Sequence, residues 1–196
     1  MRGRLKKNLD RLPSFFRPKE AEAAGLSYET LQGLVRDGKV ERVGRGLYHR
    51  VDWEPTENHS LAAVCARVPE SVVCLLSALQ VHGIGTRLPA EVWLAVPNKA
   101  RAPRVVQTRI RLVRFSGAAW SYGVIPVTFE GVRARVTNPA RTVVDCFRYR
   151  RRVGGEAAKE ALYDALRQRK VTVDALYRVL DVLPTVRLRA ALEAMP

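Results

Sequence analysis

Apolar residues in the first forty positions recur with the period of an α-helix in three short segments. Helices are predicted over residues 2–12, from 18 to about 24, and over 28–37. Ser27 is a good N-cap for the third helix, and Gly38 is suited to end it. The beginning of the chain is therefore expected to be helical with short connections.

The second and third of these segments have the spacing of a helix-turn-helix. Its pattern positions hold Ala21, Gly25, Leu26, Leu31 and Leu34. The small Ala21 permits a close crossing of two helices, and Gly25 can adopt the positive φ of a sharp turn. Glu20 departs from the pattern, because an apolar residue is common there. Gly33 costs the third helix about 1 kcal/mol relative to alanine, and we expect a close helix crossing at this point to explain it.

An alternating segment follows the third helix. Residues 40–43 and 47–50 are predicted as strands on either side of Gly44-Arg45-Gly46, which has the composition of a tight hairpin. A helix-turn-helix followed by such a hairpin describes a winged helix, whose second helix commonly enters the major groove of DNA. We place this winged-helix domain at residues 1–52.

The rest of the chain predicts a mixed module of helices and strands. Residues 51–58 contain a proline and lack periodicity, so a domain boundary is expected there and a second domain at 59–196. The first expected elements are a helix at 59–67, an apolar run at 72–76 and a short helix that is capped by Ser77 and reaches His82. Strands are expected at 92–96, 110–115, 124–129 and 132–136. Asn138 and Pro139 introduce a helix at 142–150, and further helices are expected at 156–169, 173–183 and 185–194. The predicted fold class is α+β: a winged helix followed by a mixed α/β module that ends in helices.

Composition adds a marked positive charge. The 196 residues carry a formal net charge of +15, divided as +6 over 1–50, −2 over 51–100, +8 over 101–150 and +3 over 151–196. Two basic blocks separated by a slightly acidic one favour a polyanionic partner. An arginine-rich genome would produce the same excess without such a partner, so both interpretations stay open on charge alone.

The same composition disfavours several other classes of protein. No apolar run approaches the roughly 20 residues of a membrane span, and no apolar segment follows the basic amino terminus as in a secretory signal. Cys65, Cys74 and Cys146 are far apart among apolar neighbours, which favours buried free thiols in a cytoplasmic protein. Metal-ligand spacings and phosphate-loop motifs are lacking, so neither a metal nor a cofactor is expected.

Catalytic patterns are lacking as well. Ser77 and His82 fall on different faces of one short helix and no GxSxG motif occurs, which disfavours a Ser-His-Asp hydrolase. The block 101–150 holds only two carboxylates, too few for a metal-dependent nuclease. One polar cluster is interpreted as a helix start with an i, i+4 ion pair: Arg141, Thr142 and Asp145. We therefore expect no enzyme activity.

The predicted DNA surface combines the outer side of the third helix with the hairpin. Gln32 is suited to an adenine edge, and Arg36 to a guanine or a phosphate. Arg45, between two glycines, is the expected wing tip and is suited to a minor groove. The full set of predicted DNA contacts is Ser27, Tyr28, Thr30, Gln32, Arg36, Lys39, Arg42 and Arg45. Three of them have simpler alternatives: Ser27 as a cap only, Tyr28 packed on the wing, and Lys39 solvated.

A second basic group lies on and before the strand predicted at 110–115. Its members are Arg101, Arg104, Arg109, Arg111 and Arg114. Alternation along a strand divides these arginines between its two faces. They extend the DNA footprint, present charge to a partner protein, or protect an exposed edge strand; the sequence leaves the three alternatives open.

Three blocks of sequence, in this order, resemble the AbiEi family. The first holds Gly25-Leu26-Ser27, 34–38 and 43–48, and is similar to the winged helix of that family. The second, 73–83, resembles its Ser-Ala-Leu-x-x-His-Gly segment and is followed by a similar strand at 92–97. The third, 136–145, resembles its Pro-x-Arg-Thr-x-x-Asp helix start, with Ala140 where an acidic residue is usual.

This resemblance implies a transcriptional regulator and antitoxin of a type IV toxin–antitoxin system. Its winged helix would bind double-stranded operator DNA of its own operon, and its C-terminal antitoxin domain would oppose a cognate nucleotidyltransferase toxin. One alternative is a winged-helix regulator without a toxin partner, whose C-terminal module serves assembly or sensing. Another is a DNA-processing enzyme that uses the winged helix for targeting. No membrane partner is expected.

Overall fold

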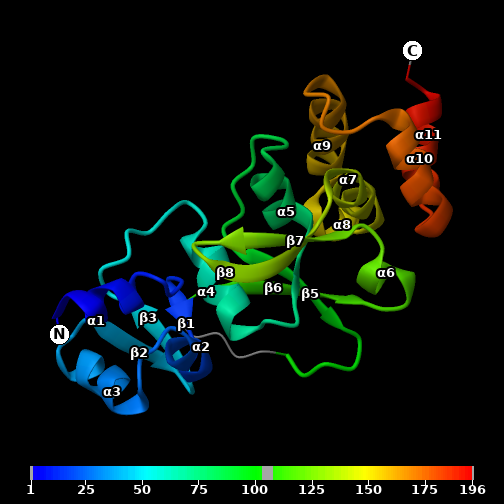
Figure 1. The fold of residues 1–196 in the computed structure, drawn as a ribbon. Helices are drawn as coiled ribbons and strands as arrows, with labels where there is room; N and C mark the ends of the chain where they lie inside the picture. Colours follow the sequence, from blue (N-terminus) through cyan, green and yellow to red (C-terminus); the bar gives the residue numbers. More distant parts are fainter. Residues whose placement is uncertain (1, 103–107, 196) are drawn as a thin grey trace. The chain divides into compact units, whose positions relative to one another are not determined.

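The computed structural model describes residues 2–102 and 108–195, which form two compact units. The first unit combines the chain up to Pro69 with Val127–Ala134, and the second combines Glu70–Pro126 with the chain from Arg135 onward. Both units contain helices and strands (Figure 1), so the α+β class predicted from the sequence is confirmed.

The first unit has the topology of a winged helix. Its elements are α1 (Arg2–Leu9), β1 (Phe15–Phe16), α2 (Pro18–Ala23), α3 (Tyr28–Arg36), β2 (Val40–Gly44), β3 (Leu47–Arg50) and α4 (His59–Arg67). The strands pair antiparallel in the order β1-β3-β2, with Phe15 opposite His49 and Val40 opposite Arg50. The helix-turn-helix α2–α3 is thus followed by a hairpin that a third strand extends.

The helix-turn-helix forms as its spacing predicts. The apolar pattern residues are all buried in one cluster: Ala21, Leu26, Leu31 and Leu34. Gly25 adopts a φ of 83°, the left-handed region that the sharp turn requires. Glu20, the departure from the pattern, has a local role, because its Oε2 accepts a hydrogen bond of 2.7 Å from the backbone N–H of Arg17 at the start of α2.

The close helix crossing expected at Gly33 is wrong. A Cβ built at this residue meets no described atom within 4 Å. Gly33 therefore weakens α3 without a packing reason inside the unit.

The second unit consists of a sheet and a set of helices. Its strands are β4 (Val72–Val73), β5 (Val92–Pro97), β6 (Ile110–Phe115), β7 (Val124–Phe129) and β8 (Val132–Thr137), in the sheet order β6-β5-β4-β8-β7. Its helices are α5 (Leu75–His82), α6 (Ala118–Ser121), α7 (Pro139–Arg148), α8 (Arg150–Val153), α9 (Gly155–Arg167), α10 (Val173–Val182) and α11 (Val186–Glu193). Strand β5 is parallel to β6 and antiparallel to β4, and β4 is parallel to β8. The far end of the β7–β8 hairpin is the part that belongs to the first unit.

Helix α7 is the centre of the helical part. It packs against α5, α9, α10 and α11, and Val143, Val144 and Cys146 are completely buried on it. Asn138 caps its start, since its side-chain oxygen accepts a hydrogen bond of 2.9 Å from the backbone N–H of Arg141. The cap predicted from the sequence is therefore confirmed.

The predicted start of helix α5 is wrong. The apolar run 72–76 is strand only at Val72–Val73, and α5 begins at Leu75, so Ser77 lies inside the helix and does not cap it. Gly83 ends α5 in the left-handed conformation, with φ 60°, as predicted. Three elements were not predicted from the sequence, namely β1, α6 and α8. Each has only two to four residues, which is too short for a periodic signal.

The compact units do not divide the chain at the boundary expected in residues 51–58. The winged-helix unit also includes α4 and the segment Val127–Ala134. A boundary between separable functions at 51–58 stays a prediction, because compact packing and separable activity are different properties.

Candidate nucleic-acid interface

The outer side of α3 presents polar side chains to solvent. Tyr28, Glu29 and Arg36 are exposed, Tyr28 with 66% of its surface. Together with Gln32 and Val35 they line a shallow hollow on this face of the helix. Tyr28 is thus turned toward solvent and is not packed on the wing.

Three of the predicted DNA contacts have partners within the winged-helix unit. The Ser27 side-chain oxygen accepts a hydrogen bond of 3.2 Å from the backbone N–H of Thr30, and the two hydroxyl oxygens lie 2.9 Å apart. Gln32 is half-buried, and its Nε2 donates to the Tyr48 hydroxyl over 3.4 Å. Ser27 is therefore the N-cap of α3, and Gln32 is oriented toward the hairpin. Contacts of these side chains with DNA stay predictions.

The β2–β3 hairpin carries exposed basic side chains at one end of the unit. Arg42 and Lys39 are exposed, and Arg45 is exposed at the turn, where Gly46 adopts a φ of 61°. Arg67 of α4 braces this hairpin, because its Nη2 donates to the carbonyl oxygen of Val43 over 2.5 Å. The wing predicted from the sequence is thus present, with its arginine outward.

The second basic group is divided in the structure. Arg101 and Arg109 are exposed, whereas Arg104 lies outside the described residues. Arg111 pairs with Glu91 over 2.8 Å and its guanidinium lies 5.1 Å from the centre of the Trp93 ring. Arg114 donates to the carbonyl oxygens of residues 97, 98 and 100. Strand β6 is an edge of the sheet order, and Arg111 and Arg114 have partners within the second unit. Contact of this group with DNA or with a partner protein, and protection of the edge strand, all stay predictions.

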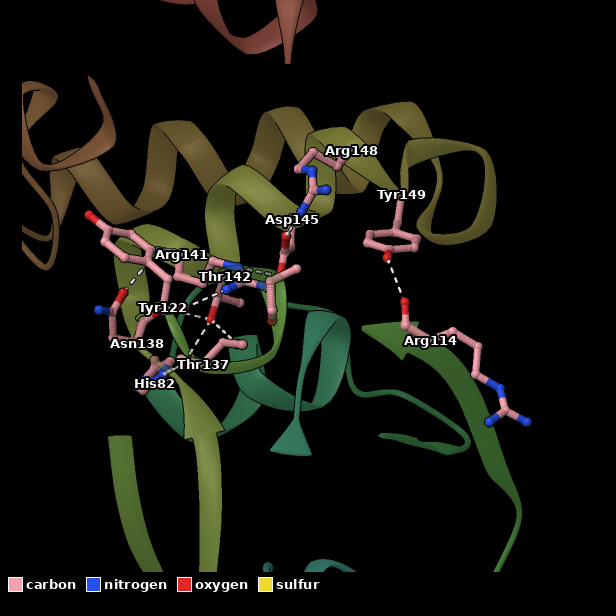
Figure 2. Close-up of polar contacts among 11 residues, drawn as sticks. His82, Arg114, Tyr122, Thr137, Asn138, Arg141, Thr142, Asp145, Arg148 and Tyr149 are labelled. Carbon is pink, nitrogen blue, oxygen red and sulfur yellow. Dashed lines mark hydrogen bonds and ion pairs between the residues drawn. The ribbon is translucent and has the colours of Figure 1, made fainter. Parts of the chain in front are cut away.

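The Arg141–Asp145 pair is completely buried, and Figure 2 shows the polar groups around it. The Arg141 Nε donates to Asp145 over 2.7 Å, its Nη1 to the carbonyl oxygen of Tyr122 over 2.5 Å, and its Nη2 to that of Ala119 over 3.0 Å. Arg148 binds the other oxygen of Asp145 over 3.0 Å. Burial raises the pKa of Asp145, and the two guanidinium groups act against that rise.

Hydroxyl and imidazole groups complete this cluster. The Thr142 hydroxyl lies 2.7 Å from that of Thr137 and 2.8 Å from the carbonyl oxygen of Asn138. His82 Nε2 binds the carbonyl oxygen of Thr137 over 2.7 Å, and burial lowers the pKa of this imidazole. Ser77 is buried and accepts a hydrogen bond of 2.9 Å from the backbone N–H of Trp93. The polar motif residues of the second unit therefore join α5, α7 and the strands, and do not form a surface site.

Sequence reasoning missed a second polar cluster, which centres on Glu130 in the β7–β8 turn. The side chain of Glu130 has no exposed surface; one oxygen accepts from the backbone N–H of Thr56 over 2.7 Å, and the other lies 2.9 Å from His59 Nδ1. Burial opposes ionisation of Glu130, but these hydrogen bonds outweigh it and hold its pKa below the ordinary value. The available signal was a glutamate before Gly131 in a two-residue turn, where glycine or asparagine is favoured; the structure gives Glu130 the positive φ of 48° that such a turn requires.

Arg50 is another buried charge that sequence reasoning missed. Its Nη2 binds Asp10 over 3.0 Å, its Nε binds Asp52 over 3.0 Å, and its Nη1 donates to the carbonyl oxygen of Leu12. Alternation along β3 places Arg50 on the same face as the buried Tyr48, so the period of the strand could have indicated an inward arginine. These bonds tie the end of β3 to the turn after α1.

Metal ligands, cysteines and long apolar helices are the remaining features that the sequence analysis raised. Within 2–102 and 108–195, no three histidine, cysteine or carboxylate side chains come together as a metal-binding group. The three cysteines are free and buried, as expected, and burial raises the pKa of Cys65 to about 12. None of the described helices is both long and apolar enough to cross a bilayer.

A winged helix with an exposed basic hairpin, joined to a mixed α/β unit, defines the class of winged-helix transcriptional regulators. Two family profiles match the chain: "Transcriptional regulator, AbiEi antitoxin" over residues 4–51, and "AbiEi antitoxin C-terminal domain" over 71–194. The chain belongs to the AbiEi antitoxin family, so the resemblance found in its sequence is confirmed.

Comparison with individual proteins adds a fold relationship. No curated protein sequence matches the chain significantly. The crystal structure of the RV2827C protein from Mycobacterium tuberculosis is similar, with a TM-score of 0.59 and 16% sequence identity over 92% of this chain and 70% of that chain. At this identity the likeness concerns the fold alone.

Proposed function

We propose that this protein represses its own operon by binding double-stranded operator DNA through α3 and the β2–β3 wing. In this proposal α3 lies in the major groove with Arg36 and Gln32 toward base edges, and Arg45 enters the adjacent minor groove. Lys39, Arg42, Ser27, Tyr28 and Thr30 hold phosphates and position the helix.

The observation that carries the proposal is the placement of exposed basic groups on both recognition elements. Arg36 lies on α3, and Arg42 and Arg45 lie on the wing, all exposed. The brace from Arg67 to the backbone of Val43 fixes the hairpin before DNA arrives, which lowers the entropic cost of ordering it on binding.

The main test is the salt dependence of operator binding by Arg45→Ala. If Arg45 contacts a phosphate or lines a minor groove, affinity falls for every sequence, and the slope of log K against log salt decreases by about one unit. Arg151→Ala is the matched control, because Arg151 is exposed on α8 in the second unit. An unchanged slope for Arg45→Ala would remove the wing from the interface.

Base recognition is tested separately. Gln32→Ala is expected to relax the preference at one base position, at a cost of about 1–3 kcal/mol. A uniform loss across all base substitutions would show that Gln32 positions the helix without reading a base. Because Gln32 also contacts Tyr48, the thermal midpoint of the variant is measured alongside.

We further propose that the second unit opposes a cognate nucleotidyltransferase toxin. Membership of the antitoxin family supports an antitoxin role, and a nucleotidyltransferase gene beside that of this protein would identify the partner. The full chain carrying Arg36→Glu and Arg45→Glu is expected to lose operator binding and to keep protection of cells that express that toxin. Loss of protection by a stably folded double variant would contradict this division, and would favour the alternative in which the second unit serves only assembly or sensing.

A further inference from the structure

The winged-helix unit contains an apolar hollow that the DNA-binding proposal does not use. It has a volume of about 460 Å³ and is lined by residues of α1, the end of α3 and the chain around β2 and β3: Leu5, Lys6, Leu9, Leu34, Lys39, Val51 and Asp52. Small-molecule sites in proteins commonly have volumes of about 300–1,000 Å³ and mostly apolar walls with a few polar groups. The hollow fits that description.

The apolar part of the lining comes from the core of the unit. Leu9 and Leu34 are buried members of its hydrophobic cluster, and Leu5 packs against the same cluster. Val51 is 54% exposed although it is large and apolar. Covering this residue removes apolar surface from water, which is favourable at about 25 cal/mol per Å².

The polar part of the lining is positive. Both carboxylate oxygens of Asp52 are held by Arg50 at 3.0 Å, and the hydrogen bond from Arg50 lowers the pKa of this carboxyl. Arg50 also binds Asp10, so these three side chains together carry one negative charge, against the two positive charges of Lys6 and Lys39. Lys6 and Lys39 also line the hollow, and the positive charge of Lys6 contributes to the lowered pKa of Asp52. A mainly apolar lining with two lysines and a net positive charge is complementary to an apolar anion.

We propose that this hollow binds a small apolar carboxylate, an aryl or alkyl acid, whose carboxylate lies at Lys6 and Lys39 and whose body covers Leu5, Leu9, Leu34 and Val51. A second protein chain is a poorer occupant, because a stable interface buries about 800 Å² per partner, far more than a hollow of seven lining residues supplies.

Occupation of the hollow has a consequence for DNA binding. Leu34 lies in the last turn of α3, and Lys39, a predicted phosphate contact, accepts a backbone hydrogen bond of 3.1 Å from Val51 through its carbonyl oxygen. A bound acid fixes the end of α3 against α1 and engages the Lys39 ammonium. This consequence rests on the proposed operator binding: where Lys39 holds a phosphate, the acid competes for the same ammonium group and weakens operator binding.

The test uses the full-length protein without DNA, so it does not depend on the proposed operator binding. Naphthalene-2-carboxylate is titrated while backbone amide shifts are followed by NMR, with naphthalene-2-methanol as the neutral control. We expect saturable shifts at the seven lining residues and at least tenfold weaker binding of the alcohol.

Lysine variants then distinguish recognition of the carboxylate charge from nonspecific apolar binding. The double variant Lys6→Gln and Lys39→Gln is expected to lose at least tenfold in affinity for the carboxylate and little for the alcohol. Lys7→Gln is the matched control, because Lys7 is exposed on α1 and does not line the hollow. Equal binding of acid and alcohol, or an unaffected double variant, would overturn the proposal. So would concentration-dependent dimerisation that shifts the same residues, because the occupant would then be a second copy.

Discussion

Replacement of Arg141 by methionine tests whether the most prominent polar motif of the second unit is structural. Methionine keeps much of the length and apolar character of the arginine stem, but it removes the guanidinium group. Three hydrogen bonds disappear, to Asp145, Tyr122 and Ala119. The guanidinium also lies 4.9 Å from the centre of the Phe115 ring, and that contact is lost too.

The expected loss of stability comes from the buried polar groups that Arg141→Met leaves without their partner. Asp145 stays completely buried with Arg148 as its one remaining ion-pair partner among the described residues, and two carbonyl oxygens lose a charged donor. Breaking a buried ion pair by removing one partner costs about 3–5 kcal/mol. Domains have a total stability of about 5–15 kcal/mol, so Arg141→Met is expected to remove a large part of the stability of the second unit.

Urea unfolding followed by tryptophan fluorescence measures this effect, because Trp93 and Trp120 lie in the second unit. With a slope of about 1–3 kcal/mol/M, the midpoint should fall by at least 1 M. Arg151→Met, at an exposed position of α8, controls for the loss of an arginine. The double variant Arg141→Met with Asp145→Leu should be less destabilised than the two single variants together, since it leaves no buried charge unpaired.

A midpoint that stays at the wild-type value in Arg141→Met would refute this reasoning. If antitoxin activity were lost at the same time, the motif would be a functional site that becomes accessible in solution.

Three further predictions concern other positions. Gly33→Ala should raise the free energy of unfolding by about 0.5–1 kcal/mol, because the added Cβ meets open space. A decrease in this free energy would contradict the prediction. Weaker operator binding by the stabilised variant would place DNA against this point of α3. Glu130→Gln should have a lower free energy of unfolding than the wild type. This difference in stability is full above pH 4.5 and shrinks as the pH falls through the lowered pKa of Glu130. A difference that does not depend on pH would exclude ionisation of Glu130 as its source. Asn138→Ala should lower stability by about 0.5–2 kcal/mol in thermal unfolding, whereas no change would mean that the cap is dispensable.

Local sequence was sufficient to predict most elements and the class of protein. Ser27 and Gly38 bound α3 because capping and the left-handed turn depend on the nearest few residues. Strand β6 and helix α4 have the bounds that their periodicity predicts. The hairpin around Arg45 was equally readable, since turn composition and strand alternation are local properties.

The burial of charged groups could not be predicted from local sequence in the same way. Arg141 and Asp145 form the i, i+4 pair that their spacing predicts, yet the sequence did not reveal that the pair is fully enclosed by residues 115–122. The cluster at Glu130 depends on residues more than seventy positions away, Thr56 and His59. Such partners leave no periodic trace along the chain, because they meet only when distant segments pack together.

The helices, the wing and the family could therefore be predicted from short-range sequence patterns, because each residue's neighbours along the chain largely determine its conformation. The interior place of Arg141, the joining of residues 127–134 to the winged helix and the hollow beside α1 arise only from long-range packing. In these places the free energy is set by which groups lose water together, and that depends on the folded chain in three dimensions.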